Sequence, residues 1–108
     1  MKRRTNPKMM DERERRIINV LMALQPGEVT TYGDIADVAG YPKLSRLVGR
    51  ILSKTDQEVP WWRVVNSSGR LVPGHEQEQT ELLQEEDVII RNNHVKSAPH
   101  GRFTPMTV

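Results

Sequence analysis

One stretch, VPWWRVVNSSG at residues 59–69, organises the rest of this chain. It contains both of the chain's two tryptophans, side by side between a proline and an arginine. One interpretation is an aromatic core plug, because tryptophan is highly buried on average and Val64-Val65 resembles the start of a strand. The other is a binding pocket lined by indole. Neighbouring side chains of an extended segment point to opposite faces, so the two rings are not expected to enter the same core.

The composition indicates one soluble globular domain of 108 residues, with 36% hydrophobic and 28% charged side chains. No apolar run approaches the roughly 18 residues that a membrane span requires, and no apolar segment follows the basic N-terminus as in a secretory signal. We therefore expect a cytoplasmic protein, associated with the nucleoid in a bacterium. We expect a basic disordered tail at residues 1–8, the folded domain at 9–90 and a loosely ordered C-terminal tail at 91–108.

The charge is distributed unevenly along the chain. Residues 1–54 hold 11 of the 16 Lys and Arg but 6 of the 14 Asp and Glu, a net charge of +5, whereas residues 55–108 carry −3. A basic half beside an acidic half indicates a surface for a polyanion, although a solvated charged face gives a similar count.

Three helices are predicted in the first half. Apolar residues at helical spacing place the first at about residues 9–24, begun by Asn6-Pro7 or by Asp11. Thr31 and Asp34 fit the capping box of a second, short helix that Gly40 ends. Pro42 suits the first turn of a third helix, whose apolar stripe is Leu44, Leu47, Val48 and Ile51.

The other face of this third helix carries a cationic row of Lys43, Arg46, Arg50 and Lys54. Like charges at helical spacing repel by a few tenths of a kcal/mol per pair, and a bound polyanion would reverse that sign. The second and third helices together predict a helix-turn-helix, with the basic helix in the recognition position. The alternative is an ordinary helical hairpin with a basic surface.

The second half of the chain predicts a wing, followed by one helix and one short strand. Residues 63–66 and 70–72 flank Ser67-Ser68-Gly69, which has hairpin-turn chemistry. The expected fold is therefore mainly α with a small β part, a winged helix-turn-helix with a three-helix core and a two-stranded wing in a single domain. A helix at 76–86 and a short strand at 88–90 follow. The three histidines show no metal-ligand spacing, so neither a metal nor a cofactor is expected.

Three segments in this order resemble one family: GEVTTYGDIA at 27–36, RLVG at 46–49 and the Trp-containing stretch at 59–69. They are similar to the DNA-binding domain of the O6-alkylguanine-DNA alkyltransferases, and most similar to the non-catalytic alkyltransferase-like proteins. In the alkyltransferases a Pro-Cys-His-Arg motif carries the acceptor cysteine. Here those two central positions are Trp61, which alkyltransferase-like proteins typically have, and Trp62, where many of them keep histidine.

Alkyl transfer from guanine O6 needs a soft nucleophile of low pKa, and a thiolate is the suitable side chain. The chain has no cysteine, so we expect no enzyme activity. The resemblance implies that Arg46 is the arginine finger that fills the gap left by an extruded nucleotide, and that Tyr32 helps to rotate the target phosphate. It implies a lesion pocket of Tyr32, Trp61, Trp62, Arg63, Val65 and Ser67, and DNA-binding residues Thr31, Tyr32, Lys43, Ser45, Arg46, Arg50 and Lys54.

The expected function is recognition of O6-alkylguanine in duplex DNA by minor-groove docking and nucleotide flipping, without alkyl transfer. The resemblance further implies handover to nucleotide excision repair proteins. We also expect a monomer that does not engage membranes. The main alternative is a winged-helix transcription regulator that reads undamaged DNA, which leaves the paired tryptophans unexplained. A fold used for protein contacts alone is a third interpretation.

Overall fold

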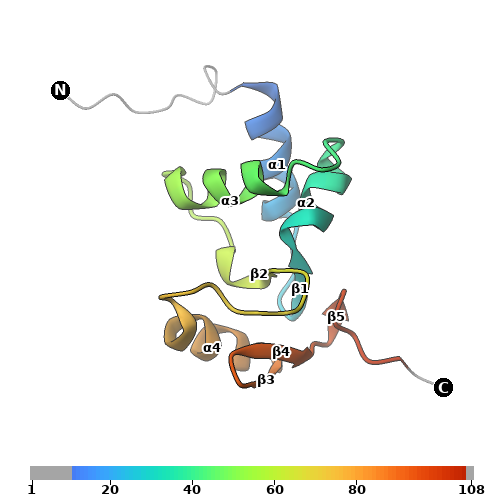
Figure 1. The fold of residues 1–108 in the computed structure, drawn as a ribbon, viewed down its shortest axis with the longest axis vertical. Coiled ribbons are helices and arrows are strands. Elements are labelled where there is room, and N and C mark those ends of the chain that lie inside the picture. Colours follow the sequence, from blue (N-terminus) through green and yellow to red (C-terminus); the bar gives the residue numbers. More distant parts are fainter. Residues whose placement is uncertain (1–10, 107–108) are drawn as a thin grey trace.

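The computed structural model describes residues 11–106, and the expected basic tail at 1–8 lies outside this range. Within these residues, four α-helices and five short strands follow one another (Figure 1). In order they are α1 (Glu12–Met22), β1 (Glu28–Thr31), α2 (Tyr32–Ala39), α3 (Ser45–Lys54), the single 3-10 turn η2 (Trp61–Arg63), β2 (Val64–Val65), α4 (Glu76–Gln84), β3 (Ile89–Arg91), β4 (His94–Ser97) and β5 (His100–Gly101).

The first helix is shorter than the predicted range of 9–24. Asp11 is its N-cap, and the Asp11 carboxylate accepts a hydrogen bond of 2.8 Å from the backbone N–H of Glu14. This satisfies one of the N–H groups that the first turn leaves without a partner. Ile17, Ile18 and Leu21 are buried on one face of α1, which decides how the helix packs.

Both ends of α2 follow the sequence prediction. The Thr31 hydroxyl accepts from the backbone N–H of Asp34 at 3.1 Å, and Gly40 ends the helix with a left-handed φ of 95°. The third helix differs, because it begins at Ser45 and leaves Pro42 in the connecting turn. Lys43 in that turn has a φ of 73°, which a helical first turn does not allow. The two helices predicted to form the helix-turn-helix are present and pack on each other.

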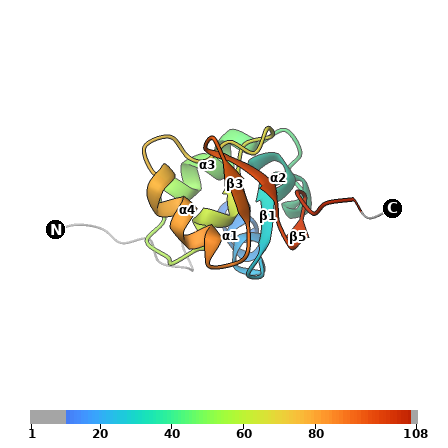
Figure 2. The same cartoon turned by 90° about the horizontal axis from the view of Figure 1, so that it is seen from below.

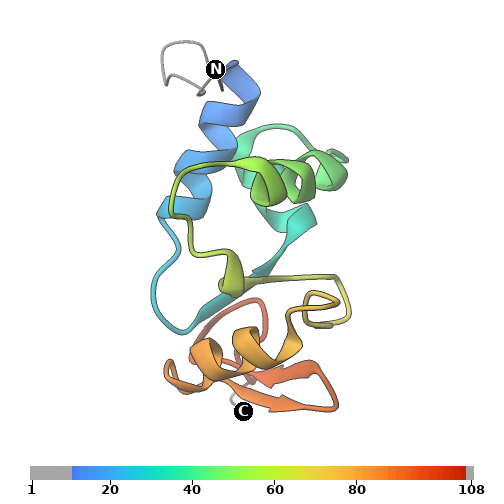
Figure 3. The same ribbon diagram turned by 90° about the vertical axis from the view of Figure 1, so that its left-hand side faces the viewer.

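A small parallel sheet in the order β2-β1-β5 lies between α1–α3 and the segment formed by α4, β3 and β4 (Figure 1), and its strands β1 and β5 are side by side in Figure 2. The buried hydrophobic residues form two separate cores. Thr30 pairs with Val64 on one edge of β1, and Val29 pairs with Gly101 on the other. Val64 packs with the buried residues of α1, α2 and α3, whereas its neighbour Val65 packs with Leu71, Leu83 and other residues of the second core. Figure 3 shows the helices α1, α2 and α3 (blue to green) above the sheet and α4, β3 and β4 (orange) below it.

The predicted wing is wrong in its pairing. Asn66 does organise a turn, with its side chain accepting from the N–H groups of Ser68 and Arg70, but β2 pairs with β1 instead of folding back as a ribbon. Both valines of β2 are fully buried, as expected for a strand covered on both faces. The antiparallel ribbon of the described residues is β3 with β4, so the winged arrangement is not confirmed. Over residues 11–106 the fold is one domain of four α-helices and two small sheets.

The segment from residue 91 to 106 is built into the domain, contrary to the expected loose tail. It supplies the end of β3, all of β4 and β5, and the buried side chains of Val95 and Ala98. Within residues 11–106, no helix combines the length and the apolar character that crossing a membrane demands. The same residues contain no group of three or more side chains placed to hold a metal ion.

Candidate nucleic-acid interface

An open cleft of about 400 Å³ lies between α3 and the start of α4. Its walls come from segments far apart in the sequence: the first turn of α2, one face of α3, the 3-10 turn, and the segment leading into α4. The lining residues are Tyr32, Gly49, Leu52, Ser53, Trp61, Val72, His75 and Glu78. Tyr32 and Trp61, both placed in the predicted lesion pocket, line the same cleft, and the six other lining residues were not predicted as part of that pocket.

The two tryptophans face different surroundings. Trp61 packs against the first core and lines the cleft, whereas Trp62 packs against the second core. Their rings meet edge to face, with centroids 6.3 Å apart. The expected separation of the rings is therefore present, although a 3-10 turn and not an extended strand produces it. Trp62 belongs to the pocket predicted from the sequence but does not line the cleft.

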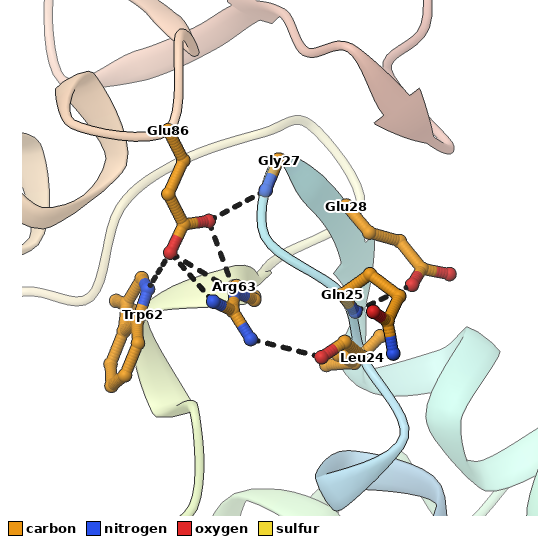
Figure 4. A network of polar contacts seen from close by, with 7 residues as sticks. All are labelled: Leu24, Gln25, Gly27, Glu28, Trp62, Arg63 and Glu86. Atoms are coloured by element: carbon orange, nitrogen blue, oxygen red, sulfur yellow. Dashed lines mark hydrogen bonds and ion pairs between the residues drawn. The ribbon is translucent and has the colours of Figure 1, made fainter.

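Glu86, in the turn that follows α4, holds the 3-10 turn in place through its side chain (Figure 4). Its carboxylate accepts hydrogen bonds from Trp62 Nε1 at 2.8 Å, from the backbone N–H of Gly27 at 2.7 Å and from Arg63 Nη2 at 2.7 Å. Arg63 also donates to the carbonyl of Leu24 at 2.9 Å and lies over the Trp62 ring, 5.1 Å from its centroid. Arg63 thus supports the turn structurally and does not enter the cleft.

This network also explains the ionisation of Glu86. Burial is the largest single influence and opposes ionisation, but the hydrogen bonds from Arg63, Gly27 and Trp62 and the charge of Arg63 outweigh it. The pKa of Glu86 is therefore lowered from its ordinary value. Both oxygens of the carboxylate already accept hydrogen bonds from neighbouring groups, Trp62 and Arg63 among them, and we assign the group no role in proton transfer.

Three other predicted residues lie away from the cleft wall. Val65 is fully buried in β2 and does not line the cleft. Ser67 is exposed in the turn that follows β2 and does not line the cleft. Thr31 is buried, and its hydroxyl accepts from the N–H of Asp34 as the N-cap of α2.

A buried glutamine fixes α4 against the cleft. Gln79 is fully buried, and its amide donates to the carbonyls of Trp62 at 3.1 Å and Val64 at 3.3 Å while accepting from the N–H of Val72 at 2.7 Å. These bonds join the helix to both chain segments that border the cleft. The rings of Trp61 and of His75, the N-cap residue of α4, are in a T-shaped contact with their centroids 5.8 Å apart.

The predicted cationic residues border a second hollow of about 400 Å³ on the other side of α3. Every charged residue that lines it is basic, and the lining residues are Arg13, Lys43, Leu44, Ser45, Arg46, Leu47 and Arg50. Within residues 11–106, none of these basic side chains forms an ion pair. We call this hollow the cationic groove. An adjacent hollow shares Arg50 with it and extends to Lys54, where Asp11, Glu14 and Asp56 reduce the positive charge.

The exposed face of α3 therefore lies between the cleft and the cationic groove. Gly49, Leu52 and Ser53 face the cleft, whereas Leu47 and Arg50 face α1. At the cleft, burial raises the pKa of the Tyr32 phenol, so the hydroxyl keeps its proton and can donate a hydrogen bond. A cleft lined by the aromatic rings of Tyr32 and Trp61 beside a basic helix suits an extruded base and its phosphate backbone.

The fold and this surface define a class of DNA-binding domain, and residues 12–88 match the family described as "6-O-methylguanine DNA methyltransferase, DNA binding domain". The chain belongs to this family. The resemblance to alkyltransferase-like proteins is also confirmed: the chain is 37% identical over 87 residues to alkyltransferase-like protein 1 of Schizosaccharomyces pombe, covering 75% of this chain and 81% of that protein.

A second group of relatives carries the name "DNA base-flipping protein". The Escherichia coli protein is 37% identical over 84 residues, and the Vibrio parahaemolyticus protein is 41% identical over 64 residues. These matches cover 74% and 57% of this chain. The chain spans 65% and 64% of the length of these two relatives, slightly under two thirds.

Solved structures show the same fold. The chain is similar to S. pombe Atl1 in complex with damaged DNA containing O6-carboxymethylguanine, with a TM-score of 0.67 and 35% identity over 76% of this chain and 82% of that one. It is also similar to the O6-methylguanine methyltransferase of Mycobacterium tuberculosis, with a TM-score of 0.63 and 31% identity over 71% of this chain and 49% of that one.

Proposed function

We propose that this protein binds O6-alkylguanine in duplex DNA and holds the extruded base in the cleft, without transferring the alkyl group. The observation that carries the proposal is the position of Trp61, whose ring lines an open cleft next to Tyr32 and beneath α3. The Atl1 complex with damaged DNA supports the same ligand class.

Binding is energetically reasonable on this surface. Flipping a base costs a few kcal/mol, and less when alkylation has weakened its pairing. Stacking on an aromatic side chain returns roughly 1–3 kcal/mol. Arg46, which is exposed at the cationic groove, is the finger that fills the gap in the base stack, and Lys43, Arg50 and Lys54 neutralise phosphates. The protein docks from the minor groove, as a wedge residue on a helix favours.

The absence of alkyl transfer follows from the chemistry of the site. By the family resemblance, Trp61 stands at the position where the enzymes carry cysteine, and an indole carbon is not a competent nucleophile towards an alkyl ether. No cysteine elsewhere in the sequence can take over. The alkyl group therefore stays on the base, and the product of binding is a marked lesion.

The test compares two duplexes that are identical except for one guanine methylated at O6. We expect tighter binding of the methylated duplex, with quenching of tryptophan fluorescence. Trp61→Phe should remove most of the quenching and Trp62→Phe should leave it, because Trp61 lines the cleft and Trp62 does not. Equal, salt-sensitive binding of both duplexes would instead support a general DNA-binding function.

The same proposal includes handover of the marked lesion to nucleotide excision repair, which rests on the family resemblance. Cells that lack this protein, the excision pathway or both should be exposed to a methylating agent. We expect the double deletion to be no more sensitive than the excision-deficient cells. An additive increase in sensitivity would separate the protein from that pathway.

A further inference from the structure

A single carboxylate, that of Glu78, lies among the residues that line the cleft in the described part of the chain. Its side chain is exposed and forms no hydrogen bond or ion pair with residues 11–106. Its neighbour Glu76 differs, because its carboxylate accepts from the N–H of Gly74 at 3.0 Å and pairs with Arg70 at 3.4 Å. The charge of Glu78 is therefore available to whatever occupies the cleft.

The position of Glu78 is fixed by the packing of α4. The next residue, Gln79, is fully buried and bonded to the carbonyls of Trp62 and Val64 and to the N–H of Val72. Rotation of the helix would break these three contacts, each of which satisfies a polar group that burial has removed from water. Glu78 consequently stays at the wall that faces Trp61 and Leu52.

We infer that Glu78 makes the cleft selective for the charge of the adduct: neutral and cationic O6 substituents are accepted and anionic ones are disfavoured. The inference rests on the proposed function and names the substrate class of the same site. A substituent on O6 of a base held against Trp61 enters the space that Glu78 lines, where an anionic substituent meets a like charge. The other ionisable groups of this wall are His75 and Tyr32.

Coulomb's law sets the size of the effect. Two like charges about 8 Å apart repel enough to lower affinity by a factor of roughly 2 in bulk water and roughly 30 at an effective dielectric constant of about 20. The cleft is open to solvent, so we expect a discrimination of roughly 3-fold to 10-fold at low ionic strength, falling as salt is added.

Substituents of matched size separate charge from steric fit. Three duplexes carry one guanine with an O6-hydroxyethyl, an O6-carboxymethyl or an O6-aminoethyl group, and a fourth carries unmodified guanine. Binding is measured for the unaltered protein, for Glu78→Gln and for Glu81→Gln. Glu81→Gln is the matched control, because Glu81 is exposed on the same helix, loses the same charge and does not line the cleft.

The unaltered protein should bind the hydroxyethyl and aminoethyl duplexes several-fold more tightly than the carboxymethyl duplex. Glu78→Gln should bring the hydroxyethyl to carboxymethyl ratio close to 1, and Glu81→Gln should leave it unchanged. A ratio that is insensitive to Glu78→Gln, or that changes equally in Glu81→Gln, overturns the inference while lesion binding stands. Equal affinity of the unaltered protein for all four duplexes overturns the proposed function together with the inference.

Discussion

Removing the carboxylate of Glu86 should destabilise the domain more than any other single change of a polar side chain described above. Its side chain is 12% exposed, and that of Arg63 is 11% exposed. Glu86→Ala leaves the indole N–H of Trp62 and the N–H of Gly27 without their acceptor. The guanidinium of Arg63 loses its charged partner and keeps only the carbonyl of Leu24. Removing one partner of a buried pair costs about 3–5 kcal/mol, and the residual exposure places this pair near about 3 kcal/mol.

The measurement is urea unfolding followed by circular dichroism. A loss of about 3 kcal/mol is a large part of the roughly 5–15 kcal/mol that stabilises a natural domain. Glu86→Gln keeps one acceptor oxygen and should cost roughly half as much. Glu85→Ala is the control, because Glu85 is exposed and should change stability by less than about 0.5 kcal/mol. In a double-mutant cycle, Arg63→Ala should cost much less in the Glu86→Ala background than alone.

The loss of the Glu86 carboxylate should also change how the stability of the domain depends on pH. The pKa of Glu86 is lower in the folded state than its ordinary value, so its contribution is fully present above the unfolded-state pKa of about 4.3. That contribution is lost as the pH falls through the folded-state pKa. Stability of the unaltered protein should therefore decline in this acidic window more steeply than that of Glu86→Gln. Parallel pH profiles, together with a loss below about 1 kcal/mol for Glu86→Ala, would refute the reasoning.

Three further predictions concern the DNA surface and the sheet. Arg46→Ala should lower affinity for alkylated DNA by roughly 10-fold or more in a binding titration, and unchanged affinity would refute the finger role. Arg13→Ala should reduce the slope of DNA affinity against salt concentration by about one phosphate contact. Arg15→Ala should reduce this slope less, because its charge is already paired with a glutamate. Equal slopes for the two variants would exclude Arg13 from the DNA-contacting surface. Gly101→Ala should cost about 2 kcal/mol in thermal unfolding, because φ is 87° and a Cβ would collide with the carbonyl of Val29; an unchanged midpoint would refute the pairing of β5.

The helices could be predicted because their signals are local. Thr31 and Gly40 mark the ends of α2 through capping chemistry that a few residues determine. The strand β1 gave no such signal, since it has four residues and ends in two buried threonines. The hairpin prediction was correct for the turn at Asn66 and wrong for the strands beside it, because the partner of Val64 is Thr30, 34 residues earlier. Pairing over that distance is decided by burial on both faces, which local turn chemistry does not show.

The candidate site divides in the same way. Tyr32, Trp61 and the basic row were recognisable because each lies in a segment with a family pattern or a helical spacing. His75 and Glu78 were missed because they belong to a polar helix whose orientation depends on Gln79. A glutamine in a polar segment is usually on the surface, so the sequence offered no signal that this one is buried.

The central position of β1 also has a consequence for how the chain acquires its fold. Its two partners lie 34 and 72 residues further along, at Val64 and His100. Contacts of such sequence separation slow folding, because the loops must close before the contacts are formed. During synthesis, α1, α2 and α3 can form early, but the edge of β1 stays unpaired until β5 has been made. Until then the nascent chain exposes an open strand edge to other chains, and the final segment of the domain is what closes it.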